Sequence, residues 1–238
     1  MALQRVALIT AGTAGLGAQV ARVLAPDFRV VINYANNEGR AKDLVQELQK
    51  IPNTSNADAQ PRFAAVQADV GDRSAIQRLV SETVKQFGRL DVVVSNAGWT
   101  RITNFSDLED AMVDEDWDKC FLYNVKAHLW LCHAAKAELE KSEGAFITTA
   151  SLAGIKPSGS SLAYSVTKAA AIHLSKGLAV ICAPKIRVNS LSPGLILTEW
   201  GMKFSEEKRE GARKATKLQR LATIEDCADA IRMLATSR

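Results

Sequence analysis

The chain has 238 residues, of which 47% are hydrophobic and 24% charged, with a formal net charge of +4. This size and composition indicate a globular protein with a substantial core and exclude a disordered chain. The densest basic stretch, residues 208–217, also contains Glu210 and follows Glu206 and Glu207. We therefore expect a solvated helix face there, not a nucleic-acid-binding surface.

The cysteines, histidines and apolar runs bear on redox state, metals and membranes. The four cysteines are far apart and form no C-x-x-C pair, which is typical of reduced thiols in a cytosolic protein. No cluster of histidine, cysteine and carboxylate residues has metal-ligand spacing, so we expect no metal site. We find no signal peptide and no apolar run long enough to span a bilayer, which predicts a cytoplasmic protein without a membrane partner.

Strand and helix patterns alternate along the chain. Short apolar runs typical of buried strands cover residues 6–10, 28–34, 63–67, 90–94, 145–150 and 186–191. Helical patterns cover residues 18–24, 38–50, 74–87, 107–139, 164–174 and 223–234, and residues 199–219 are expected to form a mobile helical segment. This alternation predicts an α/β fold of the Rossmann type. We expect a doubly wound parallel sheet with helices on both faces, in a single domain spanning residues 1–238.

A glycine-rich turn, residues 11–17, connects the first strand to the first helix. Glycines allow close approach of the backbone to a pyrophosphate, and a helix N-terminus offers free N–H groups to it. The alternative is an ordinary tight turn. Residues that follow other strands, Asp69, Asn96 and Ser151, are expected at the same edge of the sheet, where open α/β sheets bind ligands.

Residues 151–168 contain a candidate proton-transfer group. Tyr164 and Lys168 are four positions apart, so they share one face of a helix. A nearby positive charge lowers the pKa of a tyrosine, so we expect Lys168 to lower that of Tyr164. Ser151, at the end of the preceding strand, could hold a carbonyl or alcohol oxygen. Alone, a Tyr-x-x-x-Lys spacing is also common among surface residues.

Taken together, these motifs resemble the short-chain dehydrogenase/reductase family over essentially the whole chain. The glycine turn reads T-A-G-T-A-G-L-G from Thr10 to Gly17, and Ser95-Asn96-Ala97-Gly98 resembles the family's N-N-A-G. The resemblance implies an oxidoreductase that interconverts a carbonyl and a secondary alcohol. It implies the catalytic residues Asn124, Ser151, Tyr164 and Lys168. Tyr164 would exchange the proton, Lys168 would lower its pKa and hold the nicotinamide ribose, and Asn124 would support a water.

The resemblance also implies a set of cofactor-binding residues at the ends of the strands. These are Gly12, Thr13, Ala14, Gly15, Leu16, Tyr34, Ala35, Asn36, Asp69, Val70, Asn96, Ala97, Gly98, Tyr164, Lys168, Pro193, Gly194, Ile196 and Thr198. Tyr34 occupies the place where NAD-dependent members carry an acidic residue, so NADP(H) is the expected cofactor and NAD(H) the alternative. Arg40 is the closest cation in sequence, and Ala14 leaves the glycine turn without one.

Three features depart from the family pattern. Ala11 replaces a glycine and would cost roughly 1–2 kcal/mol if its φ is positive. Ser95 replaces the first asparagine of N-N-A-G. The family's last strand has no counterpart before Arg238, so one sheet edge is expected to be bare. A homo-oligomer, dimer or tetramer, is expected through the apolar helices at residues 107–139 and 164–178.

Two other functional classes stay open. The same fold could serve as a catalytically silent dinucleotide-binding sensor or scaffold, and a Tyr-x-x-x-Lys pair also occurs in epimerases and dehydratases of the extended branch. The substrate is expected to be a bulky, ring-containing carbonyl compound because apolar side chains could line a pocket, although lid packing would explain them equally. These side chains are Trp99, Leu152, Ile155, Trp200, Met202 and Phe204.

Overall fold

The computed structural model describes residues 4–54 and 61–237. Six parallel strands form one sheet in the order β3-β2-β1-β4-β5-β6. The strands are β1 (Val6–Ile9), β2 (Arg29–Tyr34), β3 (Phe63–Gln67), β4 (Val92–Ser95), β5 (Ala145–Thr149) and β6 (Arg187–Leu191). The order reverses at β1, so the sheet is doubly wound as predicted, and β6 is an edge strand in the described part of the chain.

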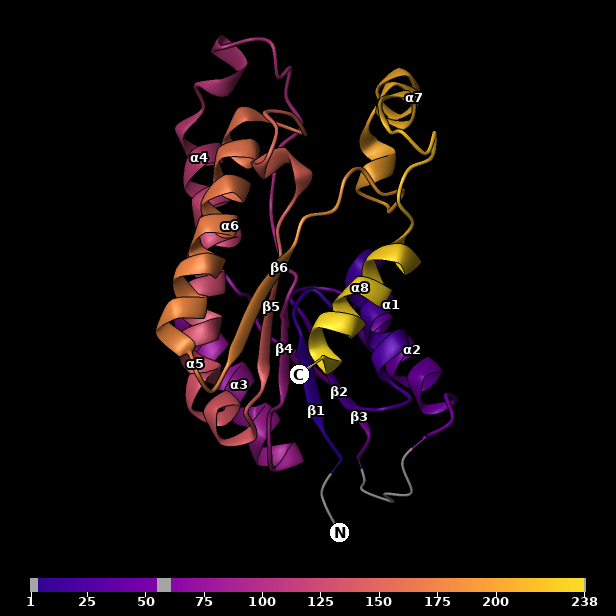
Figure 1. The fold of residues 1–238 in the computed structure, drawn as a ribbon, viewed down its shortest axis with the longest axis vertical. Helices are drawn as coiled ribbons and strands as arrows, with labels where there is room; N and C mark the ends of the chain where they lie inside the picture. Colours follow the sequence, from indigo (N-terminus) through magenta and orange to yellow (C-terminus); the bar gives the residue numbers. More distant parts are fainter. Residues whose placement is uncertain (1–3, 55–60, 238) are drawn as a thin grey trace.

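Helices cover both faces of the sheet (Figure 1). α3 (Arg73–Phe87), α4 (Asp114–Phe121), α5 (Ala127–Ser142) and α6 (Leu162–Cys182) lie on one side. α1 (Gly15–Leu24), α2 (Glu38–Gln49) and α8 (Ile224–Thr236) lie on the other. α7 (Glu206–Ala215) stands apart from both layers, beyond the ends of the strands (Figure 1).

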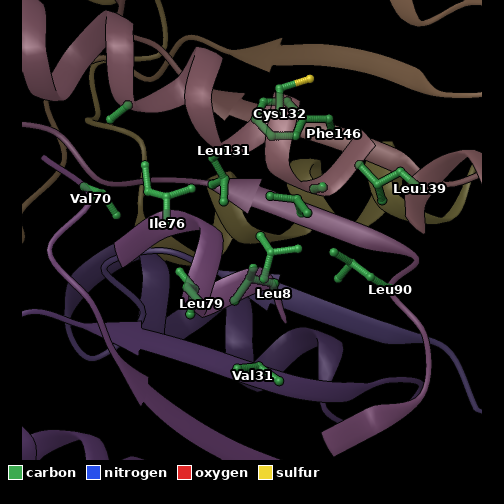
Figure 2. Packing of buried hydrophobic residues seen from close by; sticks show 14 of the residues in the cluster. Leu8, Val31, Val70, Ile76, Leu79, Leu90, Leu131, Cys132, Leu139 and Phe146 are labelled. Carbon is green, nitrogen blue, oxygen red and sulfur yellow. The ribbon is translucent and has the colours of Figure 1, made fainter. Parts of the chain in front are cut away.

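Each face of the sheet has its own apolar core. Between the sheet and α3 and α5, Leu8 packs with side chains such as Ile76, Leu131 and Phe146 (Figure 2). The opposite core joins residues of β1 and β2 to α1, α2 and α8. Strands buried on both sides need apolar residues at consecutive positions, which explains the uninterrupted runs of β1, β2 and β4.

Side-chain caps begin several helices. Asn37 caps α2, Asp72 caps α3 and Ser161 caps α6, each by accepting a backbone N–H. Thr223 and Asp226 form a capping box at the start of α8. These caps satisfy N–H groups that have no partner within the helix.

Two stretches are less regular than the sequence predicts. Residues 107–139 divide into a 3₁₀ turn (Glu109–Ala111), α4, a π-helical turn (Leu122–Lys126) and α5. Residues 199–219 contain only a 3₁₀ turn (Gly201–Lys203) and α7. Within the described residues, no helix combines the length and the apolar character needed to cross a membrane.

Candidate active site

The glycine turn follows β1, next to the point where the strand order reverses. Ala11 adopts φ 48° there, so the position does require the left-handed backbone that glycine would supply more easily. Gly15, with φ 50°, begins α1 three residues earlier than the apolar pattern predicts. No side chain caps α1, and its first turn contains no acidic residue. Its N–H groups can therefore receive an anion.

Asn96 fastens this turn to the neighbouring strands. Its Nδ2 donates to the carbonyl oxygen of Thr10 at 3.2 Å, and its Oδ1 accepts from Thr149 Oγ1 at 3.2 Å. A Cβ at Gly17 would lie 2.8 Å from Asn96 Nδ2, so only glycine fits there. The side chain of Asn96 thus shapes the predicted cofactor site through these contacts.

A cavity of about 160 Å³ lies at the ends of β1 to β4. Five of the predicted cofactor residues line it, namely Ala35, Asp69, Val70, Ala97 and Gly98. The cavity is also lined by Ala11, Asn33, Ala68 and Tyr123, which are not among the predicted cofactor residues. Tyr123 donates its hydroxyl to Asp69 Oδ2 at 3.2 Å, and burial raises its pKa. Tyr123 and Asp69 are far apart in sequence, so no local sequence pattern predicts this contact.

The end of β2 differs in detail from the expected phosphate site. Tyr34 packs against the core next to α2, and Asn36 is exposed. Asn37 uses its Oδ1 to accept the backbone N–H of Arg40 at 2.9 Å. Arg40 forms an ion pair with Glu199 from the loop after β6, with Nη2 2.9 Å from Oε1.

Ser151 and Tyr164 are positioned by helix caps. Ser151 Oγ accepts the N–H of Ala153 and begins a 3₁₀ turn, and Ser161 Oγ accepts the N–H of Tyr164 at the start of α6. A Cβ at Gly154 would lie 2.6 Å from the backbone nitrogen of Ala169, so the 3₁₀ turn packs directly on the backbone of α6. The two segments are held in fixed relation as a result.

Lys168 lies beside Tyr164 on α6. Its Nζ is 5.5 Å from the centroid of the Tyr164 ring and donates to the carbonyl oxygen of Thr149 at 2.8 Å. Lys168 is only 3% exposed, and burial lowers its pKa to about 8. Ser151, Tyr164 and Lys168 therefore come together as predicted, and we call them the Ser–Tyr–Lys cluster.

The pKa of Tyr164 is raised in this structure, whereas the sequence predicted that Lys168 would lower it. Burial raises the pKa of Tyr164 to about 12, while a hydrogen bond from Ser151 opposes the rise and the charge of Cys120 adds to it. Removing the phenol from water disfavours the phenolate, and here that effect outweighs its favourable contacts.

Asn124 is fully buried, and its side chain bonds to protein groups. It lies in the π-helical turn, accepts the N–H of Trp99 at 2.8 Å, and donates to the Trp99 carbonyl oxygen at 2.9 Å. Its Nδ2 also donates to Thr167 Oγ1 at 3.1 Å. Asn124 therefore ties the segment after β4 to α6, close to Lys168.

The loop after β6 supplies the remaining predicted contacts. The Pro193 carbonyl oxygen accepts the N–H of Leu152 at 2.8 Å, and Gly194 is exposed. A Cβ at Gly15 would lie 3.1 Å from Thr198 Cγ2, so this loop reaches the glycine turn. Ile196 packs into the core on the side of α1 and α2. Thr13 and Ala14 lie within the turn itself, and Leu16 is buried in the first turn of α1.

Residues 5–209 match the family model for short chain dehydrogenases. The chain belongs to this family. It is 36% identical, over 230 residues, to granaticin polyketide synthase putative ketoacyl reductase 2 of Streptomyces violaceoruber, which covers 95% of the chain and 87% of that relative. The short-chain dehydrogenase described here is therefore an oxidoreductase that acts on a carbonyl and alcohol pair with a nicotinamide dinucleotide.

Solved structures support the same conclusion. 7α-Hydroxysteroid dehydrogenase complexed with NADH and 7-oxo glycochenodeoxycholic acid superposes with a TM-score of 0.86 at 26% identity, covering 98% of this chain and 88% of that one. ElxO with NADP bound gives a TM-score of 0.84 at 29% identity, covering 99% and 92%.

The residues of this short-chain dehydrogenase fit such a cofactor. The uncapped N-terminus of α1 suits a pyrophosphate, and the cavity beside Asp69 and Ala35 suits an adenosine. Next to the Ser–Tyr–Lys cluster, a Cβ on Gly98 would lie 3.5 Å from Lys168 Nζ, so the backbone at Gly98 passes close to the Lys168 ammonium. Throughout residues 4–54 and 61–237, no group of three histidine, cysteine or acidic residues could hold a metal ion.

Proposed function

We propose that this short-chain dehydrogenase is an NADP(H)-preferring reductase of a bulky, ring-containing ketone, with Tyr164 as its proton donor. The main support for this proposal is that Ser151, Tyr164 and Lys168 lie together at the carboxyl edge of the sheet. The glycine turn after β1 lies at the same edge. The nicotinamide supplies or accepts the hydride when it is bound.

The side chains would divide the remaining work. Tyr164 would donate its hydroxyl proton to the substrate oxygen, and its high pKa keeps it protonated at neutral pH. Ser151 would hold the same substrate oxygen with its hydroxyl. Lys168 would stabilise the phenolate left after donation, because its ammonium lies beside the ring. Asn124 would position the backbone segment at Trp99 through its hydrogen bonds to that residue.

Replacement of Tyr164 with phenylalanine tests the proton role. We expect kcat to fall at least 10²–10⁴-fold, which is the usual contribution of general acid–base catalysis, with the cofactor Kd nearly unchanged. Tyr123→Phe is a comparison variant, because it removes a phenol hydroxyl from the cofactor cavity instead of from the cluster. It should change the cofactor Kd and leave kcat at saturating cofactor within about threefold. Near-normal turnover by Tyr164→Phe would contradict the assignment.

The competing proposal is a silent dinucleotide-binding sensor. The intact Ser–Tyr–Lys cluster favours an enzyme instead. Tight NADPH binding without turnover on a broad panel of aromatic, cyclic and polyketide-like ketones would favour the sensor. The same NADPH-oxidation screen tests the substrate class.

The preference for NADP(H) rests on the end of β2. No acidic residue lies between Asn33 and Asn37, so nothing on that segment would repel a 2′-phosphate. Arg40, in the first turn of α2, is the nearest cation in sequence. Measuring the Kd of NADPH and NADH by nicotinamide fluorescence tests the preference, and tighter binding of NADH would contradict it.

The outer surface of α4 to α6 supports a homo-oligomer. Large apolar side chains are exposed there, including Phe121, Leu129, Val166, Val180 and Ile181. Val180 alone is 80% exposed. We propose that a second copy covers this face.

The four free cysteines also fit a reducing compartment such as the cytoplasm.

A further inference from the structure

An ion pair joins the first turn of α2 to the loop after β6. Arg40, in the first turn of α2, donates from Nη1 to Glu199 Oε2 at 3.0 Å and places Nη2 2.9 Å from Oε1. The contact is bidentate, and the two residues are 159 positions apart in sequence. Glu199 belongs to the loop that leads from β6 to Trp200 and α7.

The residue before Glu199 reaches the phosphate side of the same site. Thr198 lies against Gly15, whose Cβ, if present, would be 3.1 Å from Thr198 Cγ2. The segment from Thr198 to Glu199 therefore extends from the glycine turn to the start of α2. In the proposed placement of the dinucleotide, the glycine turn binds the phosphates and the cavity lined by Ala35 and Asp69 holds the adenosine, so the ribose would lie between these two points.

Arg40 has the side chain best suited to a phosphate among the described cations of α2. Its planar guanidinium can bind a phosphate through two hydrogen bonds, whereas Lys42, paired with Glu38 at 2.7 Å, offers a single ammonium. The Arg40 and Glu199 side chains are 47% and 73% exposed. An exposed ion pair contributes little stability, so its partners exchange easily. A phosphate offers a guanidinium the same bidentate geometry with more charge.

We propose that Arg40 changes partner when the cofactor carries a 2′-phosphate. With NAD(H), Arg40 stays on Glu199 and holds the loop before α7 against α2. With NADP(H), Arg40 binds the phosphate, and Glu199 is released together with that loop. Glu199 thereby competes with the phosphate and sets how strongly the enzyme prefers NADP(H). The inference rests on the proposed preference at the end of β2.

Dissociation constants of NADPH and NADH test the exchange. Glu199→Gln removes the competitor, so we expect NADPH to bind about two- to fivefold more tightly, with NADH changed less than twofold. Arg40→Gln should weaken NADPH binding about tenfold and leave NADH nearly unchanged. In the double variant, Glu199→Gln should have no further effect on NADPH.

Arg22→Gln is the matched control. Arg22 forms an equally bidentate pair with Glu47, at 2.7 and 2.9 Å, between α1 and α2. Its removal should change neither Kd. If Glu199→Gln changes the Kd of NADPH and the Kd of NADH equally, the ion pair has only a structural role and the inference is overturned. An unchanged ratio of the NADPH and NADH dissociation constants in Arg40→Gln would also overturn the inference.

Hydrogen exchange of α7 gives a second readout. Peptides covering Glu206–Ala215 should exchange faster with saturating NADPH than with saturating NADH, and Glu199→Gln should abolish that difference. Identical exchange in the two wild-type complexes would contradict release of the loop. If the wild type binds NADH more tightly while Glu199→Gln still favours NADPH selectively, the proposed preference fails and the partner exchange stands.

Discussion

Trp200 packs edge-on against Tyr164, with ring centroids 5.9 Å apart and ring planes at 75°. Trp200 follows Glu199 directly, so the segment that reaches α2 also covers the phenol of the Ser–Tyr–Lys cluster. The indole is 37% exposed and excludes water from one side of the Tyr164 ring. This contact contributes to the burial that raises the pKa of Tyr164.

Replacing Trp200 with alanine should therefore lower the pKa of Tyr164 from about 12 towards its ordinary value of 10.0. Trp200→Phe retains a ring and should shift the pKa less. Absorbance titration of the phenolate measures this, because the chain has only 3 tyrosines and Tyr164→Phe identifies the relevant one. An unchanged titration in Trp200→Ala would show that other groups account for the burial.

Ala11→Gly should stabilise the protein without cofactor. Ala11 has φ 48°, where a Cβ costs about 1–2 kcal/mol, whereas the added flexibility of glycine in the unfolded chain costs about 0.4–1 kcal/mol. The net gain should be about 0.5–1 kcal/mol in urea unfolding. Ala14→Gly is the control: Ala14 has φ −152°, so only the flexibility cost applies and stability should fall. A loss of stability in Ala11→Gly would refute the strain.

His128 should make stability depend on pH. It is buried, with Nδ1 2.6 Å from Ser95 Oγ, and burial followed by the charge of Lys168 lowers its pKa from 6.5 to about 3. The unfolded chain thus binds more protons between pH 6.5 and pH 3, so stability falls as the pH drops through this window. At pH 5 the loss from His128 should be about 2 kcal/mol relative to neutral pH.

The difference between the wild type and His128→Asn isolates this contribution from the carboxylates. Urea unfolding at pH 7 and pH 5 should show a smaller pH effect in the variant, whatever its stability at pH 7. Parallel losses in both proteins would show that His128 does not titrate in this window. Ser95, which replaces the first asparagine of N-N-A-G, is the hydrogen-bonding partner of His128 at this site.

Light scattering at micromolar concentration should give a mass of two or more chains of 25.8 kDa each. Leu129→Glu, on α5, should lower that mass, because a carboxylate on a covered apolar face is costly to bury. Leu218→Glu is the control, since Leu218 is exposed on the segment after α7. A wild-type mass of one chain would refute the proposed oligomer.

The sequence predicts the strands well because a parallel sheet buried on both faces needs continuous apolar runs. It also predicts that Ala11 is strained if its φ is positive, because an alanine stands where the family has a glycine, and the observed φ of 48° meets that condition. The rise in the pKa of Tyr164 depends on how Trp200 and the surrounding loops exclude water, which no local pattern reports. The ion pair of Arg40 with Glu199 joins distant segments and becomes visible only when they are folded.

The sheet order has a consequence for synthesis of the chain on the ribosome. β2 pairs with β1, β3 with β2, β4 with the other edge of β1, and β5 and β6 each with the strand made just before. Every strand therefore emerges after its partner and can add to an edge that already exists. α8 is the exception to this early assembly: it packs over α1 and is made after all six strands, so that face of the sheet stays open to chaperones until α8 itself has emerged.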